Sequence, residues 1–388
     1  MGMSGRLFRT VAGGEHVHAF IPSPLPPVPA LNVVPLQRSL DRANQAVGRL
    51  DGAGLILPNP ELFIYMAVRK EALLSSQIEG TQSSLSDLLL FEAHEPFTSP
   101  IEDVLEVSNY VAAMNHGLSR LREGFPLSLR LLREIHAVLL KGGRGSDKDP
   151  GEFRRSQNWI GGTRPGDARF VPPPPHELQA CLGNLELFIH DDASDLPLLV
   201  RVALVHVQFE TIHPFLDGNG RLGRLLITFM LCDAGALQSP LLYLSLYLKQ
   251  HRDRYYELLQ AVRERGAWIE WLEFFVEAST FTAEASSDTI RRMLKLFADS
   301  RARIETLGRN AASASRVIAV LERSPIVSIT FVADELGLSF PTVSTAIKRL
   351  ESLGLVQELS GQMRGRSFAY RAYLDLLSEG TEPLSRSG

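Results

Sequence analysis

A histidine and a glycine-rich turn stand together in the run HPFLDGNGRLGR, which covers residues 213–224. The glycines of the DGNG turn (217–220) can adopt backbone conformations that are closed to most residues, so that consecutive N–H groups point toward one place. The residues that follow, RLGRLLITFML, have helical spacing, and the turn therefore lies at a helix N-terminus. Free amide donors and the positive end of the helix dipole together make an anion site, and phosphate is the ligand that we expect there.

Four side chains of this run fit chemistry on a phosphate. Arg221 and Arg224 are three apart on the first helical turn, and both can fork onto phosphate oxygens. Asp217 supplies a hard carboxylate oxygen of the kind that Mg²⁺ accepts alongside phosphates. His213 is the natural general base at neutral pH. DGNG alone is a common turn, and a histidine beside a proline is usually structural, but their combination within one short run favours a site.

The run resembles the signature of the Fic family, HPFx[DE]GNGRxxR, at every defined position. The resemblance implies a mainly α fold, with a helical core and a β-hairpin flap, that transfers AMP from ATP to a hydroxyl group of a target protein. In that family the motif histidine, here His213, deprotonates the attacking Ser, Thr or Tyr, and Asp217 holds Mg²⁺ on the phosphates. The resemblance also assigns ATP binding to Gly218, Asn219, Gly220, Arg221, Leu222, Gly223 and Arg224, with Arg224 at the γ-phosphate.

A second motif, SSQIEG, occupies residues 75–80. Ser75 and Glu79 share one helix face, and Gly80 is a usual residue after a helix end, so that an ordinary helix terminus explains the motif when it is taken alone. The run nevertheless matches the family's inhibitory pattern, [ST]xxxE[GN], and its surroundings resemble the bacterial subclass with an inhibitory helix in cis. Glu79 can form a bidentate pair with Arg224 and so contact the ATP site as an inhibitor. In some relatives the same glutamate supports removal of AMP, and the sequence leaves this reverse activity open.

Two further segments match elements of the family. The clear β signal of the first 310 residues lies at about 156–172, where two extended pieces flank a Gly/Pro-rich tip. It matches the flap, which holds extended target segments by main-chain pairing, although a plain connecting hairpin is the alternative. We expect nucleotide contacts from this flap and from a tyrosine pair that lines the adenine side in relatives. These residues are Ile160, Gly161, Gly162 and Thr163, with Tyr255 and Tyr256. A pair of ordinary core tyrosines would give the same sequence pattern.

The elements that must position these residues divide the chain into six segments. We expect an extended, proline-rich strap over 1–35, an N-terminal helical region with the inhibitory helix over 36–108, the Fic catalytic core over 109–280, a helical linker over 281–310, a winged helix-turn-helix over 311–376 and a disordered tail over 377–388. The winged helix follows from three helical segments and two short strands in that order.

The C-terminal segment leaves its partner open. Small polar and basic residues that suit DNA contact lie along the expected recognition helix and wing: Thr342, Ser344, Thr345, Lys348, Arg349, Arg364 and Arg366. Residues 311–388 nevertheless carry eight Lys and Arg against eight Asp and Glu, and this neutrality weakens the prediction, because DNA affinity depends on phosphate contacts. Protein docking or dimerisation is the alternative. The rival to an enzyme is therefore a DNA-binding transcriptional regulator whose Fic core senses nucleotide.

Composition limits the remaining possibilities. A net charge of −4 over 388 residues argues against a surface coated for nucleic acid. Cys181 and Cys232 belong to no CxxC or Cys/His cluster, which argues against a zinc site or a disulfide scaffold. The sequence shows no membrane span and no secretory signal, so we expect a cytoplasmic protein without a membrane partner. The family resemblance adds ATP as co-substrate, Mg²⁺ as cofactor and a homodimer.

Overall fold

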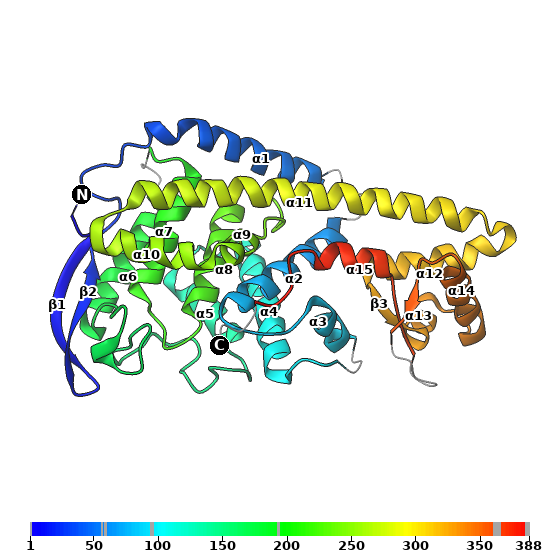
Figure 1. Ribbon diagram of the computed structural model, residues 1–388, viewed down its shortest axis with the longest axis horizontal. Coiled ribbons are helices and arrows are strands. Elements are labelled where there is room, and N and C mark those ends of the chain that lie inside the picture. The colour runs from blue at the N-terminus through cyan, green and yellow to red at the C-terminus, as the bar shows by residue number, and fades with distance from the viewer. Residues whose placement is uncertain are drawn as a thin grey trace.

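Helices α1 (Gln37–Leu55) and α11 (Trp268–Glu305) lie side by side along one face of the molecule (Figure 1). The structure is a computed structural model that describes residues 2–55, 57, 60–93, 97–191, 195–359 and 366–384. Helix α11 is 38 residues long, and its sequence contains no glycine or proline that would break it. It crosses position 280, the expected end of the catalytic core, and connects the helical body to the C-terminal domain as a single helix.

The helical body is built around α7 (Leu198–Ile212), which is buried at every position from Val202 to Ile212. A helix without a solvent face must be covered on all sides, and α7 contacts α6 (Pro175–Ile189), α8 (Asn219–Asp233), α10 (Arg252–Arg265) and α11. The body also contains α2 (Pro60–Ile78), α3 (Leu85–Glu92), α4 (Ile101–Arg122), α5 (Leu129–Leu139), α9 (Ser245–Gln250), η1 (Val34–Leu36) and η2 (Pro165–Asp167). In the part of the chain that the structure describes, no helix is long and apolar enough to cross a membrane.

The expected extended strap over 1–35 contains a β-hairpin that the sequence analysis did not predict. Strands β1 (Gly5–Ala12) and β2 (Glu15–Pro22) pair antiparallel through a turn at Gly13 and Gly14, whose φ angles are +53° and +83°. Positive φ at both turn positions is typical of two-residue hairpins, and glycine adopts it without strain. The Gly-Gly pair between two runs rich in β-formers is the sequence signal for this hairpin.

The expected flap hairpin over 156–172 contains one antiparallel bridge, between Ile160 and Phe170. On the other side of this segment the N–H of Phe20 in β2 donates to the carbonyl of Val171 at 2.8 Å. The N-terminal hairpin therefore pairs with one edge of the flap, and the side of Ile160 is the edge that a target segment could join.

The C-terminal domain confirms the winged helix-turn-helix. Its elements are η3 (Gly308–Asn310), α12 (Ala311–Arg323), β3 (Ile326–Ser328), α13 (Ile329–Leu336), α14 (Phe340–Ser352), β4 (Gln357–Glu358) and β5 (Ser367–Ala369), with the strands in the order β3-β5-β4. Ser328 and Ser339 cap α13 and α14 with their side-chain oxygens. Of the two expected wing arginines, Arg364 lies outside the described residues and Arg366 forms an ion pair with Glu358.

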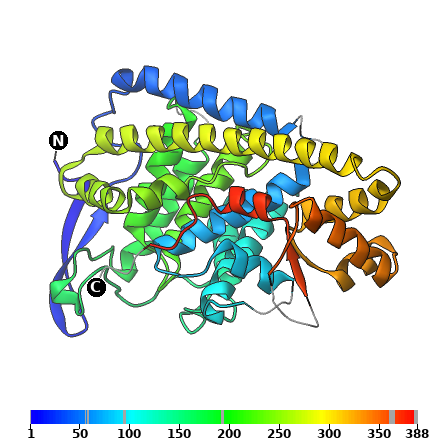
Figure 2. The same cartoon turned by 45° about the vertical axis from the view of Figure 1, so that its right-hand side comes forward.

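The tail beyond residue 377 is not disordered over its described part, which ends at residue 384. Helix α15 (Arg371–Ser378) packs on α2, α3 and α11, and the chain then runs back over the helical body (Figures 1 and 2). Leu376 and Leu377 are buried there, as is Thr381 beyond the helix. Burial of this apolar face is the physical reason that the expectation fails.

Candidate functional site

The predicted anion turn lies where α7 ends and α8 begins. His213 follows the last residue of α7 with a left-handed backbone, φ +49°, and Gly218 precedes α8 with φ +75°. The N–H of Leu222 donates to the carbonyl of Gly218 at 3.0 Å. The amides of residues 219–221 consequently have no partner within the helix, as an anion site at this helix start would require, and the binding of an anion there stays a prediction. A non-glycine residue in the left-handed region is uncommon, and here it turns the histidine out of the helix.

Asn219 holds the turn with its side chain. Its Oδ1 accepts from the N–H of Phe215 at 2.9 Å, and its Nδ2 donates to the carbonyl of the same residue at 2.8 Å. The side chain of Asn219 is therefore occupied by the backbone of the turn, which leaves its N–H as the group that could face a phosphate. This reciprocal pair fixes the spacing between the histidine and the start of α8.

Two side chains outside the motif also hold this turn, and neither was predicted. Arg154 is buried and donates to the carbonyls of His213 at 2.9 Å and Pro173 at 2.5 Å. The ring of His136 stacks on Phe215, with ring centroids 3.7 Å apart. Its Nδ1 accepts from the N–H of Gly151 at 2.8 Å, so Nε2 carries the proton and donates to the Asp217 carbonyl at 3.0 Å. Both anchors come from residues far from the motif in sequence, which explains why its pattern gave no signal for them.

The turn opens on a cavity of about 140 Å³. Its walls combine the motif, the end of α2 and two residues that were not predicted: Glu79, Glu106, Arg144, His213, Leu216, Asp217, Gly218, Asn219, Gly220 and Arg221. Arg221 Nη1 lies 3.1 Å from Glu106 Oε1, and its Nη2 lies 3.6 Å from Asp217 Oδ1. Burial raises the pKa of Glu106, and the charge of Arg221 opposes that shift. The cavity is thus lined by both signs of charge, as a site for a metal–phosphate group requires.

The environment of His213 keeps its ring neutral. Its pKa is lowered to about 3, mainly by burial and also by the charges of Arg154 and Arg263, while the Glu79 carboxylate opposes the shift. Its Nδ1 is buried, so Nε2 is the nitrogen that can face the cavity. A neutral imidazole at physiological pH is ready to accept a proton.

Glu79 reaches Arg224 from the end of α2. Arg224 Nη2 donates to Glu79 Oε1 at 2.6 Å and to the Ser75 carbonyl at 3.1 Å, while its Nε donates to Ser75 Oγ at 2.8 Å. The guanidinium is 1% exposed, so this is a buried cation that shares its donors between two residues of one helix. The predicted bidentate pair is therefore a single contact, and Ser75 takes the second position.

A larger groove, of about 1,070 Å³, lies between the flap and α10. Ile160, Gly161, Gly162 and Tyr256 line it, and their contact with a nucleotide stays a prediction. Thr163 instead donates to Asp167 within the flap tip, at 3.1 Å.

Three residues predicted to bind ATP lie in the core. Tyr255 is buried, and its hydroxyl meets His206 Nε2 at 2.8 Å. Leu222 is fully buried in the hydrophobic core, and a Cβ on Gly223 would stand 2.3 Å from Glu210 Oε1. These positions face the protein core, because one turn of α8 or α10 can present only part of its surface to a ligand.

Asp217 is the residue that fits a metal ion. Its Oδ1 accepts from the N–H of Gly218 at 2.6 Å, and its carboxylate lies on the cavity wall. Among the described residues no cluster of three or more His, Cys, Asp or Glu could hold a metal. A single carboxylate beside a phosphate site suits Mg²⁺, which keeps waters and takes its other ligands from the nucleotide.

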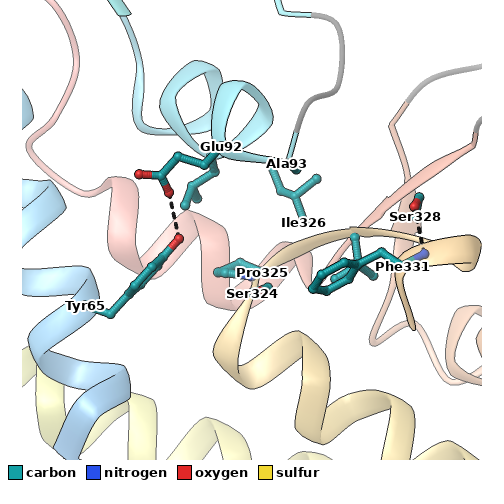
Figure 3. Close-up of a pocket in the computed structure, with 10 residues that line it drawn as sticks. Tyr65, Glu92, Ala93, Ser324, Pro325, Ile326, Ser328 and Phe331 are labelled. Atoms are coloured by element: carbon teal, nitrogen blue, oxygen red, sulfur yellow. Dashed lines mark hydrogen bonds between the residues drawn. The ribbon is translucent and has the colours of Figure 1, made fainter. Parts of the chain in front are cut away.

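A smaller cavity, of about 110 Å³, lies where α2 and α3 meet the C-terminal domain (Figure 3). Tyr65 donates to Glu92 at 2.7 Å on one side of it, and Pro325, Ile326 and Phe331 line the other (Figure 3). It contains none of the motif residues. Tyr65 of α2 and residues of the winged helix line it together.

Three family models match this chain. Residues 37–119 match the Fic/DOC family N-terminal model, residues 126–231 match the Fic/DOC family model, and residues 314–357 match a winged helix-turn-helix DNA-binding model. The chain therefore contains a Fic/DOC N-terminal segment and a Fic/DOC domain. The whole cavity turn lies within the matched Fic segment, and the end of α2 lies within the matched Fic N-terminal segment.

Relatives of this Fic chain include two mosquito proteins named protein adenylyltransferase Fic. That of Culex quinquefasciatus is 37% identical over 139 residues, 36% of this chain and 25% of the relative. That of Aedes aegypti is 30% identical over 229 residues, 58% of this chain and 42% of the relative. The Fic chain thus spans less than half the length of either. A Fic family protein from Desulfovibrio desulfuricans G20 has the same fold, with a TM-score of 0.57 at 17% identity over 88% of this chain and 97% of that one.

Proposed function

We propose that this Fic chain is a protein adenylyltransferase, which transfers AMP from ATP to Ser, Thr or Tyr hydroxyls of target segments and of itself. The observation that carries the proposal is the cavity on which His213, Asp217, Arg221 and the free amides of α8 converge. The mosquito relatives named protein adenylyltransferase support it. The groove between the flap and α10 offers room for the nucleoside and an extended target segment.

The proposed reaction uses each of these groups once. His213 accepts the proton of the target hydroxyl, whose oxygen bonds to the α-phosphorus of ATP while the bond to the bridging oxygen breaks and pyrophosphate leaves. The amides of residues 219–221 and the guanidinium of Arg221 offset the charge on the phosphates. Asp217 would hold Mg²⁺, which supplies further charge neutralisation on the same oxygens.

Autoinhibition through Glu79 is part of the proposal. A Cβ placed on Gly220 would stand 2.4 Å from Glu79 Oε1, so this carboxylate lies directly over the first turn of α8, where an anion would bind. It also occupies Arg224, the expected partner of the γ-phosphate. ATP is then held in an orientation that does not suit in-line attack. Reverse removal of AMP by the same carboxylate stays an open alternative.

The proposal is tested by incubating the chain with Mg²⁺ and ATP that carries its label on the α-phosphate, then measuring label on the chain and on lysate proteins. Glu79→Gly should raise incorporation, and His213→Ala in that background should abolish it. Glu123→Gly, another glutamate just after a helix end, is the matched control. Incorporation from γ-labelled ATP instead would show phosphate transfer, and incorporation that persists without His213 would contradict the role of the base.

DNA binding by the winged helix is a second candidate, favoured by the family match over 314–357. Thr342, Thr345 and Lys348 are exposed on α14, which is the expected recognition helix. Electrophoretic mobility shifts at increasing salt test it: Lys348→Ala should weaken binding and reduce the salt dependence. Absence of salt-sensitive binding would leave protein docking as the role of this domain.

The homodimer and the cytoplasmic location remain predictions from the family resemblance and the composition. Light scattering of the full chain after size exclusion tests the first, and fractionation of cells that express it tests the second.

A further inference from the structure

The segment after α15 binds the end of the inhibitory helix. Gln77, which is fully buried, donates through Nε2 to the carbonyls of Thr381 at 2.7 Å and Ser83 at 3.1 Å. Thr381 is itself 3% exposed, and its N–H and Oγ1 donate to the carbonyl of Ser378. Gln77 stands two residues before Glu79, so the tail contacts the last turn of the helix that carries the inhibitory carboxylate.

Basic side chains of three helices surround this segment. Lys249 of α9 is buried and donates to the carbonyl of Gly380 at 3.2 Å and to that of Glu382. Arg292 of α11 forms two hydrogen bonds with the Glu379 carboxylate, at 2.7 and 2.6 Å. Lys70 of α2 is also buried, and burial lowers its pKa while the charges of the tail residues Glu379 and Glu382 oppose that shift. We call this set of Lys70, Gln77, Lys249 and Arg292 the tail groove.

The ligand of the tail groove is matched to it in charge and in shape. Residues 378–384, SEGTEPL, carry two glutamates and no basic residue. Gly380 has φ +76°, and a Cβ on it would stand 2.8 Å from Leu246 Cδ1, so the chain passes closely over α9 at a residue that only glycine fits. Burial lowers the pKa of Lys249 to about 8, and the charge of Glu382 opposes that shift. The bound tail therefore both covers this lysine and stabilises its charge.

Several buried polar atoms at and just beyond the end of α2 have no hydrogen-bond partner among the described residues. Ser76 Oγ, Gln77 Oε1, Thr81 Oγ1 and Ser83 Oγ are buried without a hydrogen-bond partner in the part of the chain that the structure describes. Unpaired buried polar atoms destabilise the segment that contains them. The last turn of α2 consequently depends on external contacts, of which the Thr381 carbonyl is one.

We propose that the tail groove is a binding site for an acidic peptide segment, filled in cis by residues 378–384, and that this occupancy holds the last turn of α2 with Glu79 in its inhibitory position. The inference rests on the proposed inhibition by Glu79. The eight residues of α15 connect β5 of the winged helix to the tail groove. A ligand that displaces the wing would therefore pull the tail from the groove and release Glu79.

The test compares the full chain with a chain that ends at Ser378, and a chain that ends at Leu384 is the matched control because it keeps the docked segment. Hydrogen exchange of the peptide 71–83 should become about tenfold faster in the chain that ends at Ser378 and should stay unchanged in the control. Amine labelling of Lys249 should rise in parallel. Incorporation of α-labelled AMP should also increase about tenfold, and Glu79→Gly should remove any difference between the chains. Added SEGTEPL peptide should restore protection, whereas a scrambled peptide should not.

The results distinguish failure of the tail proposal from failure of the proposed function. Unchanged exchange at 71–83 after truncation would overturn the proposal. Faster exchange without more AMP transfer, in a protein that Glu79→Gly activates, would show that the docked tail does not control Glu79 and would also overturn it. If Glu79→Gly itself yields no AMP transfer, the proposed function fails instead, and the exchange and labelling still report whether the tail binds in this groove.

Discussion

Glu79 Oε1 and Arg224 Nη2 lie 2.6 Å apart although 145 residues of sequence separate them. The guanidinium is almost completely buried and the side chain of the carboxylate is 33% exposed. The two partners therefore differ in freedom: Arg224 is fixed by α8 and Ser75, whereas Glu79 can leave toward solvent. Because one partner can move while the other is fixed, the contact suits the proposed reversible inhibition.

Ser75→Ala should activate AMP transfer, but less than Glu79→Gly does. The change removes the Oγ that accepts from Arg224 Nε at 2.8 Å and leaves the ion pair in place. Loss of one hydrogen bond to a charged group, about 1.5 kcal/mol net, corresponds to roughly a tenfold rise in label incorporation. Ser76→Ala is the matched control, since its Oγ is buried without a hydrogen-bond partner among the described residues. A rise equal to that of Glu79→Gly would mean that Ser75, and not the carboxylate, is the brake.

The rate of AMP transfer should be nearly independent of pH between 6 and 8. A histidine with an ordinary pKa of about 6.5 would lose its base form as the pH falls through that value. Burial lowers the pKa of His213 to about 3, so the ring stays neutral over the whole range and the rate should fall only under more acidic conditions. Single-turnover self-modification of the Glu79→Gly chain, with circular dichroism at each pH as the folding control, measures this. An inflection near 6.5 would show an ordinary titration.

Arg154→Met should destabilise the chain by about 3 kcal/mol and abolish transfer. The carbonyls of His213 and Pro173 would lose their donor inside the protein, and the turn that carries the base would lose its anchor. The neighbouring Arg155 is exposed, and Arg155→Met should change neither property. Urea unfolding and label incorporation measure the two effects. Equal behaviour of the two variants would rule out the anchoring role.

The adjacent tyrosines should separate stability from nucleotide binding. Tyr255→Phe removes the hydroxyl partner of His206 and should cost about 1–3 kcal/mol of unfolding free energy, with the KM for ATP unchanged. Tyr256→Ala removes a side chain from the groove wall and should raise that KM with little loss of stability. Thermal unfolding and steady-state rates in the Glu79→Gly background distinguish them. A higher KM for ATP in Tyr255→Phe and an unchanged KM in Tyr256→Ala would mean that the adenosine does not bind against Tyr256.

Asp217→Asn should raise the Mg²⁺ concentration needed for half-maximal rate and lower the maximal rate about 100-fold or more. The amide keeps an oxygen for the N–H of Gly218, which Asp217 Oδ1 accepts at 2.6 Å, so the fold of the turn should survive. Titration of Mg²⁺ against single-turnover rate measures the change. A rate that is insensitive to this substitution would exclude Asp217 as the metal ligand.

The sequence by itself determined the local parts of this protein. The proposed base, the proposed metal carboxylate and the glycine-rich turn are contiguous, and a turn at a helix start depends on residues that are neighbours in the chain. The winged helix was predictable for the same reason, because caps and helical periods are read within short windows. The contact of Glu79 with Arg224 followed from the family resemblance, whereas the single hydrogen bond between them and the bonds of Arg224 to Ser75 did not.

Only the tertiary structure decided which residues surround these motifs. Glu106 and Arg144 enter the cavity from separate segments, and packing turns Tyr256 toward the groove while it buries Tyr255. The N-terminal hairpin on the flap and the ordered tail on α2 are likewise contacts between segments far apart in the chain. A single sequence shows the periodicity of each segment but not which helix faces pack together. Burial of apolar surface is favourable against any partner of suitable shape.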